Sequence, residues 1–156
     1  MPVHVVLRSK LRSLRSQRLF PVVRRALARA TRARADFRIV HFSVQADHLH
    51  LIVEADEQEA LSGGMQGLAV RVARAVNRLI SRCGALWSGR YYARDLGSPR
   101  AVKHAVRYVL NNFRKHGEAV RGERDPCSSA IYDVRRSEER EHVPISVPKT
   151  WLARFG

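Results

Sequence analysis

The segment DHLHLIVE, residues 47–54, decides how the rest of this chain folds. Apolar residues alternate with other residues along it, and Leu, Ile and Val dominate, which predicts a β-strand. Side chains of a strand alternate between two faces, so His48, His50 and Ile52 share one face. Two imidazoles on one rigid element are suited to form half of a divalent metal site. Two histidines on an exposed sheet face would give the same pattern.

The length and composition are those of a single globular domain with an unusual charge. A chain of 156 residues, 45% hydrophobic and 28% charged, is long enough to bury a core and is not of the disordered class. The formal net charge of +15 predicts a polyanionic partner, nucleic acid above all. Nearly all the basic residues are arginines, which suit bidentate contacts with phosphate.

The cysteine count and the hydropathy indicate the cellular compartment of the protein. Cys83 and Cys127 form no disulfide framework, and no cysteine pair has the spacing of a structural zinc site. No apolar run approaches the length of a membrane span, and the N-terminus lacks a signal-peptide h-region. We therefore expect a cytoplasmic protein with no membrane partner.

The other segments complete an α+β pattern around the histidine strand. Strands are predicted at residues 3–7, 37–44 and 86–95, and helices at 19–34, from an acidic lead-in at 56–59 to about Cys83, and from Ser98 to about His116. The first six elements follow the βαββαβ order of a ferredoxin-like antiparallel sheet with two helices on one face. Only the third helix is then available to cover the open face that carries His48 and His50.

The third helix separates an apolar stripe from a polar group that contains a tyrosine. At about 100° per residue the stripe consists of Val102, Val106, Val109 and Phe113. Tyr108 lies off this stripe, in line with His104, Asn112 and Lys115. A tyrosine of the core would lie among the valines, so Tyr108 is a candidate functional residue.

The second helix carries a basic stripe. Arg71, Arg74, Arg78 and Arg82 recur on one side of it without acidic partners, which favours phosphate contacts over a merely solvated face. Aromatic residues at 87–92 either pack in the sheet or stack on bases. Further candidates for DNA contact are Arg90, Tyr92, His104 and Lys115.

These motifs together resemble those of the HUH single-tyrosine transposases, in particular the REP-associated tyrosine transposases and related insertion-sequence transposases. His48-Leu49-His50 is similar to their His-hydrophobe-His motif, and YVLNN at 108–112 is similar to their tyrosine helix. Supporting blocks are VHV at 3–5 and WSGRYY at 87–92.

The resemblance covers roughly residues 2–117, which we interpret as one catalytic domain, 1–117. It leaves residues 118–156 as a Pro-punctuated extension that packs on the same domain, through Ile131, Tyr132, Trp151 and Phe155, or is partly disordered. The chain departs from these relatives in having Asp47 where Asn is frequent, and Phe113 where many have Pro.

The resemblance implies metal-dependent cleavage and strand transfer of single-stranded, hairpin-bearing DNA. Tyr108 would be the nucleophile of a 5′-phosphotyrosine intermediate, and His48, His50 and Asn112 would hold Mg²⁺ or Mn²⁺. An ion is needed because a tyrosine with a pKa of about 10 is a poor nucleophile at neutral pH. The alternative is a domesticated protein that binds folded single-stranded DNA or RNA without cutting it. A monomer and a homodimer are both compatible with the sequence, as is use of Tyr108 on either subunit's metal site.

Overall fold

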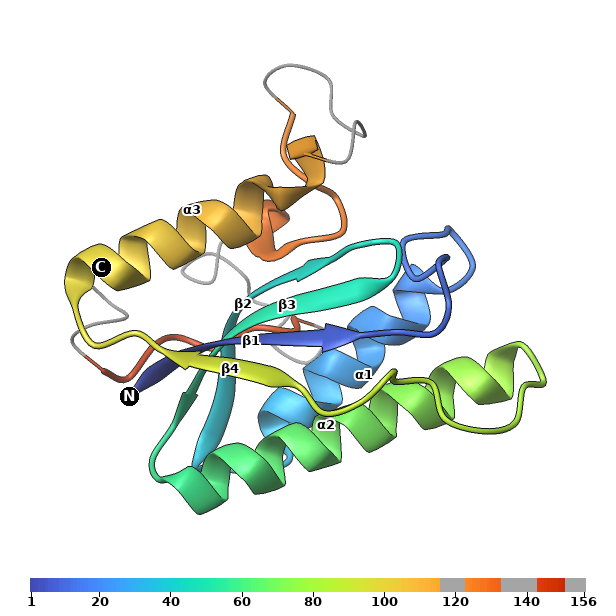
Figure 1. The fold of residues 1–156 in the computed structure, drawn as a ribbon, viewed down its shortest axis with the longest axis horizontal. Coiled ribbons are helices and arrows are strands. Elements are labelled where there is room, and N and C mark those ends of the chain that lie inside the picture. Colours follow the sequence, from blue (N-terminus) through green and yellow to red (C-terminus); the bar gives the residue numbers. More distant parts are fainter. Residues whose placement is uncertain (116–122, 133–142, 151–156) are drawn as a thin grey trace.

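The computed structural model describes residues 1–115, 123–132 and 143–150. They form a four-stranded antiparallel sheet with α1 and α2 on one face and α3 on the other (Figure 1). The strands are β1 (Pro2–Arg8), β2 (Phe37–Val44), β3 (His48–Ala55) and β4 (Tyr92–Asp95), and the helices are α1 (Phe20–Arg32), α2 (Gln58–Leu79) and α3 (Pro99–Lys115). The strand order β2-β3-β1-β4 and the βαββαβ connectivity confirm the predicted ferredoxin-like α+β fold.

The histidine strand β3 lies inside the sheet, between β1 and β2. Its leucines and Val53 belong to the main core beneath α1 and α2, whereas Ile52 belongs to a second, smaller core beneath α3. The predicted alternation of faces is therefore confirmed. The register sets Val6 of β1 and Ser43 of β2 opposite His50, and Arg8 opposite His48.

Helices α1 and α2 cover the sheet face opposite α3 with apolar residues that the helical period predicted to be buried. Leu19, Val23, Leu27 and Ala30 are all buried in the main core, as are Leu61, Leu68 and Val72 of α2. Gly64 allows α2 to approach β2, because a Cβ there would lie 2.2 Å from the Phe37 ring. Within the described ranges, no helix is long and apolar enough to cross a bilayer.

The second helix ends earlier than the sequence predicted, at Leu79 instead of near Cys83. Ser81 has a φ of +52°, a left-handed conformation that stops the helical hydrogen-bond ladder. Arg82 then folds back, and its guanidinium donates to Asn77 Oδ1 at 3.2 Å and to the Ala85 carbonyl at 3.1 Å. Arg82 therefore does not continue the arginine stripe of α2.

The fourth strand is shorter than predicted, since it starts at Tyr92 and not at residue 86. The preceding residues are anchored to other elements. Trp87 donates from Nε1 to the Ala69 carbonyl of α2 at 2.9 Å, and its backbone bridges to Ser9. Leu86 is buried in the main core. The backbone at 86–88 still pairs with the end of β1, since Ser88 N donates to the Arg8 carbonyl at 2.9 Å and Lys10 N donates to the Leu86 carbonyl at 2.8 Å. Residues 89–91 interrupt this pairing, so β4 itself begins only at Tyr92.

Two described parts of the C-terminal region pack along the outer edge of β2. Val44 N donates to the Cys127 carbonyl at 2.8 Å, and Ser146 N donates to the Ile39 carbonyl at 2.8 Å. Asp125 is fully buried and forms a bidentate ion pair with Arg15, at 2.8 and 3.0 Å. The edge of β2 thus has partners from its own chain, which protects it from pairing with another strand.

Of the four side chains expected to anchor the extension, two fall within the described ranges. Tyr132 packs on Phe42 with ring centroids 6.2 Å apart, whereas Ile131 is exposed. Trp151 and Phe155 lie outside the described residues.

A partly buried histidine on β2, His41, is expected to make the fold sensitive to acid. Burial lowers the pKa of His41 from 6.5 to about 4, and its Nδ1 lies 3.1 Å from Ser129 Oγ. Between pH 6.5 and 4 the unfolded chain binds a proton that the folded chain does not. The free energy of unfolding therefore decreases as the pH is lowered through this window. We expect a loss on the order of 2–3 kcal/mol, measured by urea unfolding at stepped pH. His41→Gln should flatten this dependence, and an equal slope in both proteins would contradict the assignment.

Candidate active site

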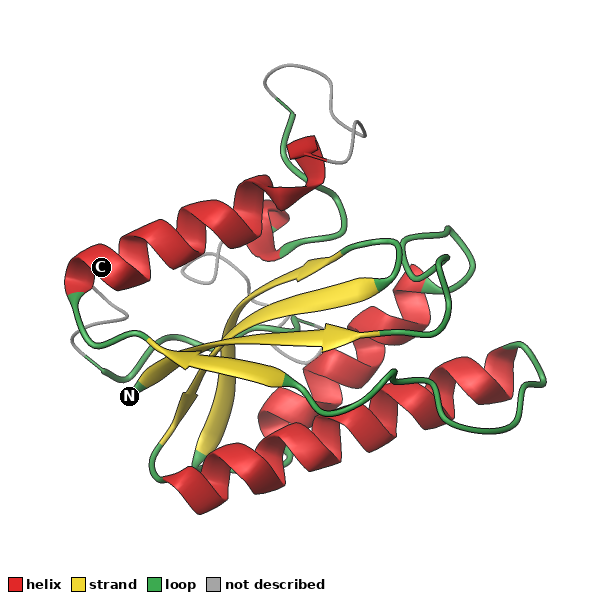
Figure 2. Cartoon of the chain, viewed as in Figure 1, coloured by secondary structure: helices red, strands yellow, loops and turns green. Residues whose placement is uncertain are grey.

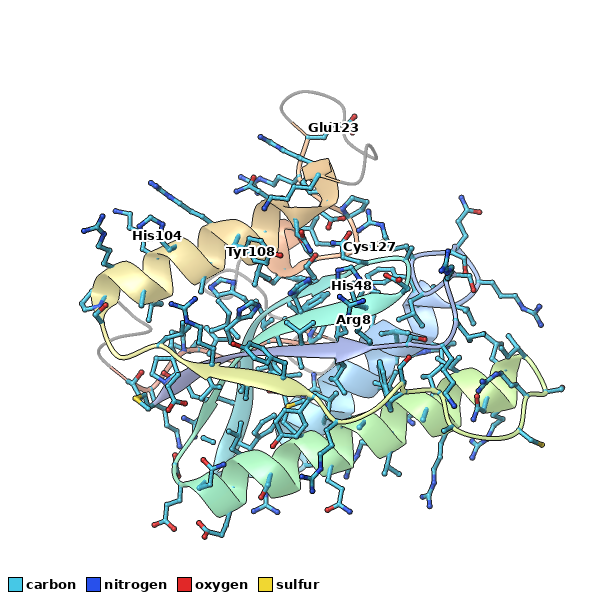
Figure 3. All side chains as sticks on the ribbon, in the orientation of Figure 1. Arg8, His48, His104, Tyr108, Glu123 and Cys127 are labelled. Atoms are coloured by element: carbon cyan, nitrogen blue, oxygen red, sulfur yellow. The ribbon has the colours of Figure 1, made fainter. Side chains whose placement is uncertain are left out.

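Helix α3 brings Tyr108 against the histidine strand. The helix starts at an N-cap, where Ser98 Oγ accepts from Ala101 N at 3.2 Å, and its valines pack on Ile52. The Tyr108 ring then lies edge-on to His50, with ring centroids 5.5 Å apart and an interplanar angle of 80°. Figure 3 shows Tyr108 on the side of α3 that faces the sheet, near the strand that carries His48. Tyr108 remains 41% exposed, so a substrate can reach it.

The two histidines of β3 stand together beneath this tyrosine. Their ring centroids are 4.8 Å apart at an interplanar angle of 76°. His48 Nδ1 lies 2.6 Å from Asp47 Oδ1, and this hydrogen bond lowers the pKa of the Asp47 carboxyl. His50 is only 4% exposed, and its Nδ1 lies 3.3 Å from His4 Nε2. A metal ligated by either histidine would therefore be bound through Nε2, with Nδ1 fixed by a second residue.

His4 of β1 is a site residue that the sequence analysis did not single out. Its ring stacks on His50 at a centroid distance of 5.5 Å and lies 5.9 Å from the Tyr108 ring. Burial, and then the charge of Arg94, lower the pKa of His4 below 6.5, so the ring is neutral at neutral pH. A neutral His4 can accept the proton of His50 Nδ1, which leaves the His50 Nε2 lone pair for a ligand. Strand alternation in residues 2–8 was the signal that could have placed His4 on this face.

Asn112 lies one helical turn beyond Tyr108 and is 2% exposed, more deeply buried than its place off the apolar stripe predicted. Its Nδ2 has no hydrogen-bond partner among the described residues. Rotation of the amide would exchange Nδ2 for the oxygen, the atom that binds cations. Within the described ranges, no three His, Cys, Asp or Glu residues are placed so that they could hold a metal ion together. The candidate donors for a divalent ion on this side of the sheet are therefore the two imidazoles of β3 and the buried amide of Asn112 on α3.

Three of the predicted DNA-contact residues lie on the same side of the sheet as Tyr108. Lys115 holds its Nζ 4.6 Å from the centroid of the Tyr108 ring. Tyr92 and His104 line a cleft that also includes Tyr108 and His50. These side chains surround the tyrosine with cationic and aromatic groups, which is the chemistry of single-strand binding.

The remaining predicted contacts lie elsewhere. Arg71, Arg74 and Arg78 line a groove of about 650 Å³ between α1 and α2, together with Arg25 and Arg29. Figure 1 shows α1 and α2 on the face of the sheet opposite α3, so this groove lies on the other side of the sheet from Tyr108. Arg90 lines a third hollow, beside Trp87 and Tyr91. The structure therefore divides the basic residues between two faces of the sheet.

The fold built from these elements is that of a REP-associated tyrosine transposase. The chain belongs to the IS200-like transposase family, whose model matches residues 1–112. No curated protein matches the chain.

Two solved structures share the fold. A REP-associated tyrosine transposase bound to a REP hairpin superposes with a TM-score of 0.70 at 22% identity, over 86% of this chain and 79% of that one. A crystallised transposase-like protein from Deinococcus radiodurans R1 superposes with a TM-score of 0.52 at 16% identity, over 77% of this chain and 92% of that one.

Proposed function

We propose that this chain cuts and rejoins single-stranded DNA beside a hairpin, with Tyr108 as the nucleophile. The observation that supports this most directly is the Tyr108 ring 5.5 Å from His50, on a helix packed against the histidine strand. Family membership supports a transposase, and the hairpin bound to the REP-associated relative suggests the substrate.

In the proposed reaction the Tyr108 oxygen bonds to the scissile phosphorus as the bond to the 3′ oxygen breaks. The products are a 5′-phosphotyrosine link and a free 3′-hydroxyl, and attack by a second 3′-hydroxyl reverses the step without an energy cofactor. Lys115, beside the Tyr108 ring, supplies positive charge where the phosphate must approach. His4 and Asp47 hold the rings of His50 and His48 in place.

The residues that would hold Mg²⁺ or Mn²⁺ are His48, His50 and Asn112. When bound, such an ion polarises the phosphate and stabilises charge on the oxygens that attack and leave. Imidazole ligands bind Mn²⁺ more readily than Mg²⁺, which prefers oxygen, so Mn²⁺ is the ion to test first.

The decisive assay is formation of a covalent protein–DNA adduct. The protein is incubated with labelled single-stranded hairpins and Mn²⁺ or Mg²⁺, then separated under denaturing conditions. A protein-linked label that requires the metal supports the proposal. If the protein binds hairpins but forms no adduct with any strand or ion tried, the proposal is wrong and the chain is a non-cleaving binding protein.

A separate prediction concerns the groove between α1 and α2. If Arg71, Arg74 and Arg78 each neutralise a phosphate, DNA affinity depends on salt with a log–log slope of about −0.7 per contact on single strands. Replacing all three with Gln should then flatten the slope by about 2, as measured by anisotropy titrations at stepped salt. Thermal unfolding of the variant is the control for folding, and an unchanged slope would assign these arginines to solvation alone.

A further inference from the structure

Helix α3 leaves part of its face of the sheet uncovered. It packs on β2 and β3 and lies farther from β4 (Figure 2). The side chains of β1 and β4 on this face border a cleft of about 820 Å³, a volume typical of ligand sites. The register sets Tyr92 beside Val6 and Arg94 beside His4 on its floor.

The lining of the cleft combines an aromatic ring, apolar walls and unneutralised positive charge. Tyr92 is 65% exposed, so one face of its ring is accessible. Arg94 and Arg100 make no hydrogen bond or ion pair with any residue that the structure describes, and none of the described residues lining the cleft is a carboxylate. The apolar walls are formed by Val6, Leu96, Ala101 and Ala105.

The cleft is continuous with the tyrosine, because Tyr108 and His50 line it as well. A phosphate attacked by Tyr108 must lie at this end, so a neighbouring nucleotide of the same strand falls beside the cleft. Both faces of a base inside a duplex are covered by its neighbours. Only an unpaired base can offer a face to Tyr92 while its phosphate meets an arginine.

We propose that this cleft binds an unpaired nucleotide next to the scissile phosphate, with Tyr92 stacking on the base and Arg94 and Arg100 contacting phosphate. The assignment rests on the proposed function for the position of the scissile phosphate. Binding in the cleft does not require cleavage, so it can be measured on a protein that cannot cut.

The test uses the Tyr108→Phe protein and a DNA hairpin with oligothymidine tails on both sides. A single 2-aminopurine, whose fluorescence falls when it stacks on an aromatic ring, is moved one tail position at a time. We expect quenching at one position or at adjacent positions within one tail. Tyr92→Ala should remove this quenching and weaken affinity by about fivefold or more, whereas Tyr92→Phe should retain both.

The arginines are tested in the same protein. Arg94→Gln should reduce the salt slope of binding by about 0.7, the loss of one phosphate contact. Arg34→Gln is the matched control, because Arg34 pairs with Asp36 in the loop before β2 and should leave the quenching pattern unchanged.

Quenching that persists in Tyr92→Ala with unchanged affinity would overturn the proposal, as would the absence of quenching at every tail position. The cleavage assay is independent of this result. If the wild-type protein forms no adduct while Tyr92-dependent quenching is present, the proposed cleavage is wrong and the proposed nucleotide site in the cleft is supported. If an adduct forms without Tyr92-dependent quenching, the proposed cleavage is supported and the proposed nucleotide site in the cleft is wrong.

Discussion

Replacing Tyr108 with Phe is expected to abolish the covalent DNA adduct, with a loss of at least about a thousandfold in the rate of its formation. The substitution removes only the oxygen that would bond to phosphorus. The ring keeps its edge contacts with His4 and His50, so the fold should be unchanged. DNA affinity, measured by anisotropy, should remain within about twofold because the phenol oxygen supplies little ground-state binding.

Tyr91→Phe is the matched control for this experiment. Tyr91 packs against the main core and lines the hollow with Arg90, away from the cleft beside Tyr108. This variant should form the adduct at the wild-type rate. If the Tyr108→Phe protein still forms an adduct, then Tyr91, Tyr92 or Tyr132 carries the chemistry and the assignment of Tyr108 is wrong.

Replacing His50 with Ala should also abolish the adduct, but through loss of the metal. Loss of a ligand should weaken metal affinity by at least about a hundredfold, so a higher Mn²⁺ concentration should restore part of the activity. His48→Ala should behave in the same way. Asn112→Ala should be milder, since water can replace one neutral oxygen ligand.

Thermal unfolding gives a readout of this site that does not depend on activity. Binding to the folded state alone raises Tm, so Mn²⁺ should raise the Tm of the wild-type protein and not that of His50→Ala. The Tm without metal shows how much packing the substitution itself removes, because His50 is nearly fully buried. A wild-type Tm that does not respond to Mn²⁺ or Mg²⁺ would refute the metal assignment.

The face assignments could be made from the sequence because they depend on local periodicity. A period of two puts His48, His50 and Ile52 on one side of β3, and the structure has them so, with Ile52 beneath α3. A period of 3.6 sets Tyr108 apart from Val102 and Val109, which are buried while Tyr108 is partly exposed. The element order then left α3 as the cover of the open face.

Some element ends depended on contacts that no local pattern contains. The sequence predicted that the second helix runs to about Cys83 and that the fourth strand begins at residue 86. The structure ends the helix at Leu79 and starts the strand at Tyr92. Trp87 fastens the intervening chain to Ala69 and Arg82 fastens it to Asn77, and a period of two or of 3.6 residues reveals neither contact.

The sequence by itself determined which side chains share a face, and hence that a tyrosine helix would lie over a strand with two histidines. Only the tertiary structure decided which residues meet across elements. His4 reaches His50 because β1 pairs with β3, and the cleft at Tyr92 exists because α3 covers the β2–β3 side of the sheet. The arginines of α2 face away from Tyr108 because α1 and α2 occupy the opposite face. Periodicity is a property of neighbouring residues, whereas strand order, register and helix placement are fixed by packing over the whole chain.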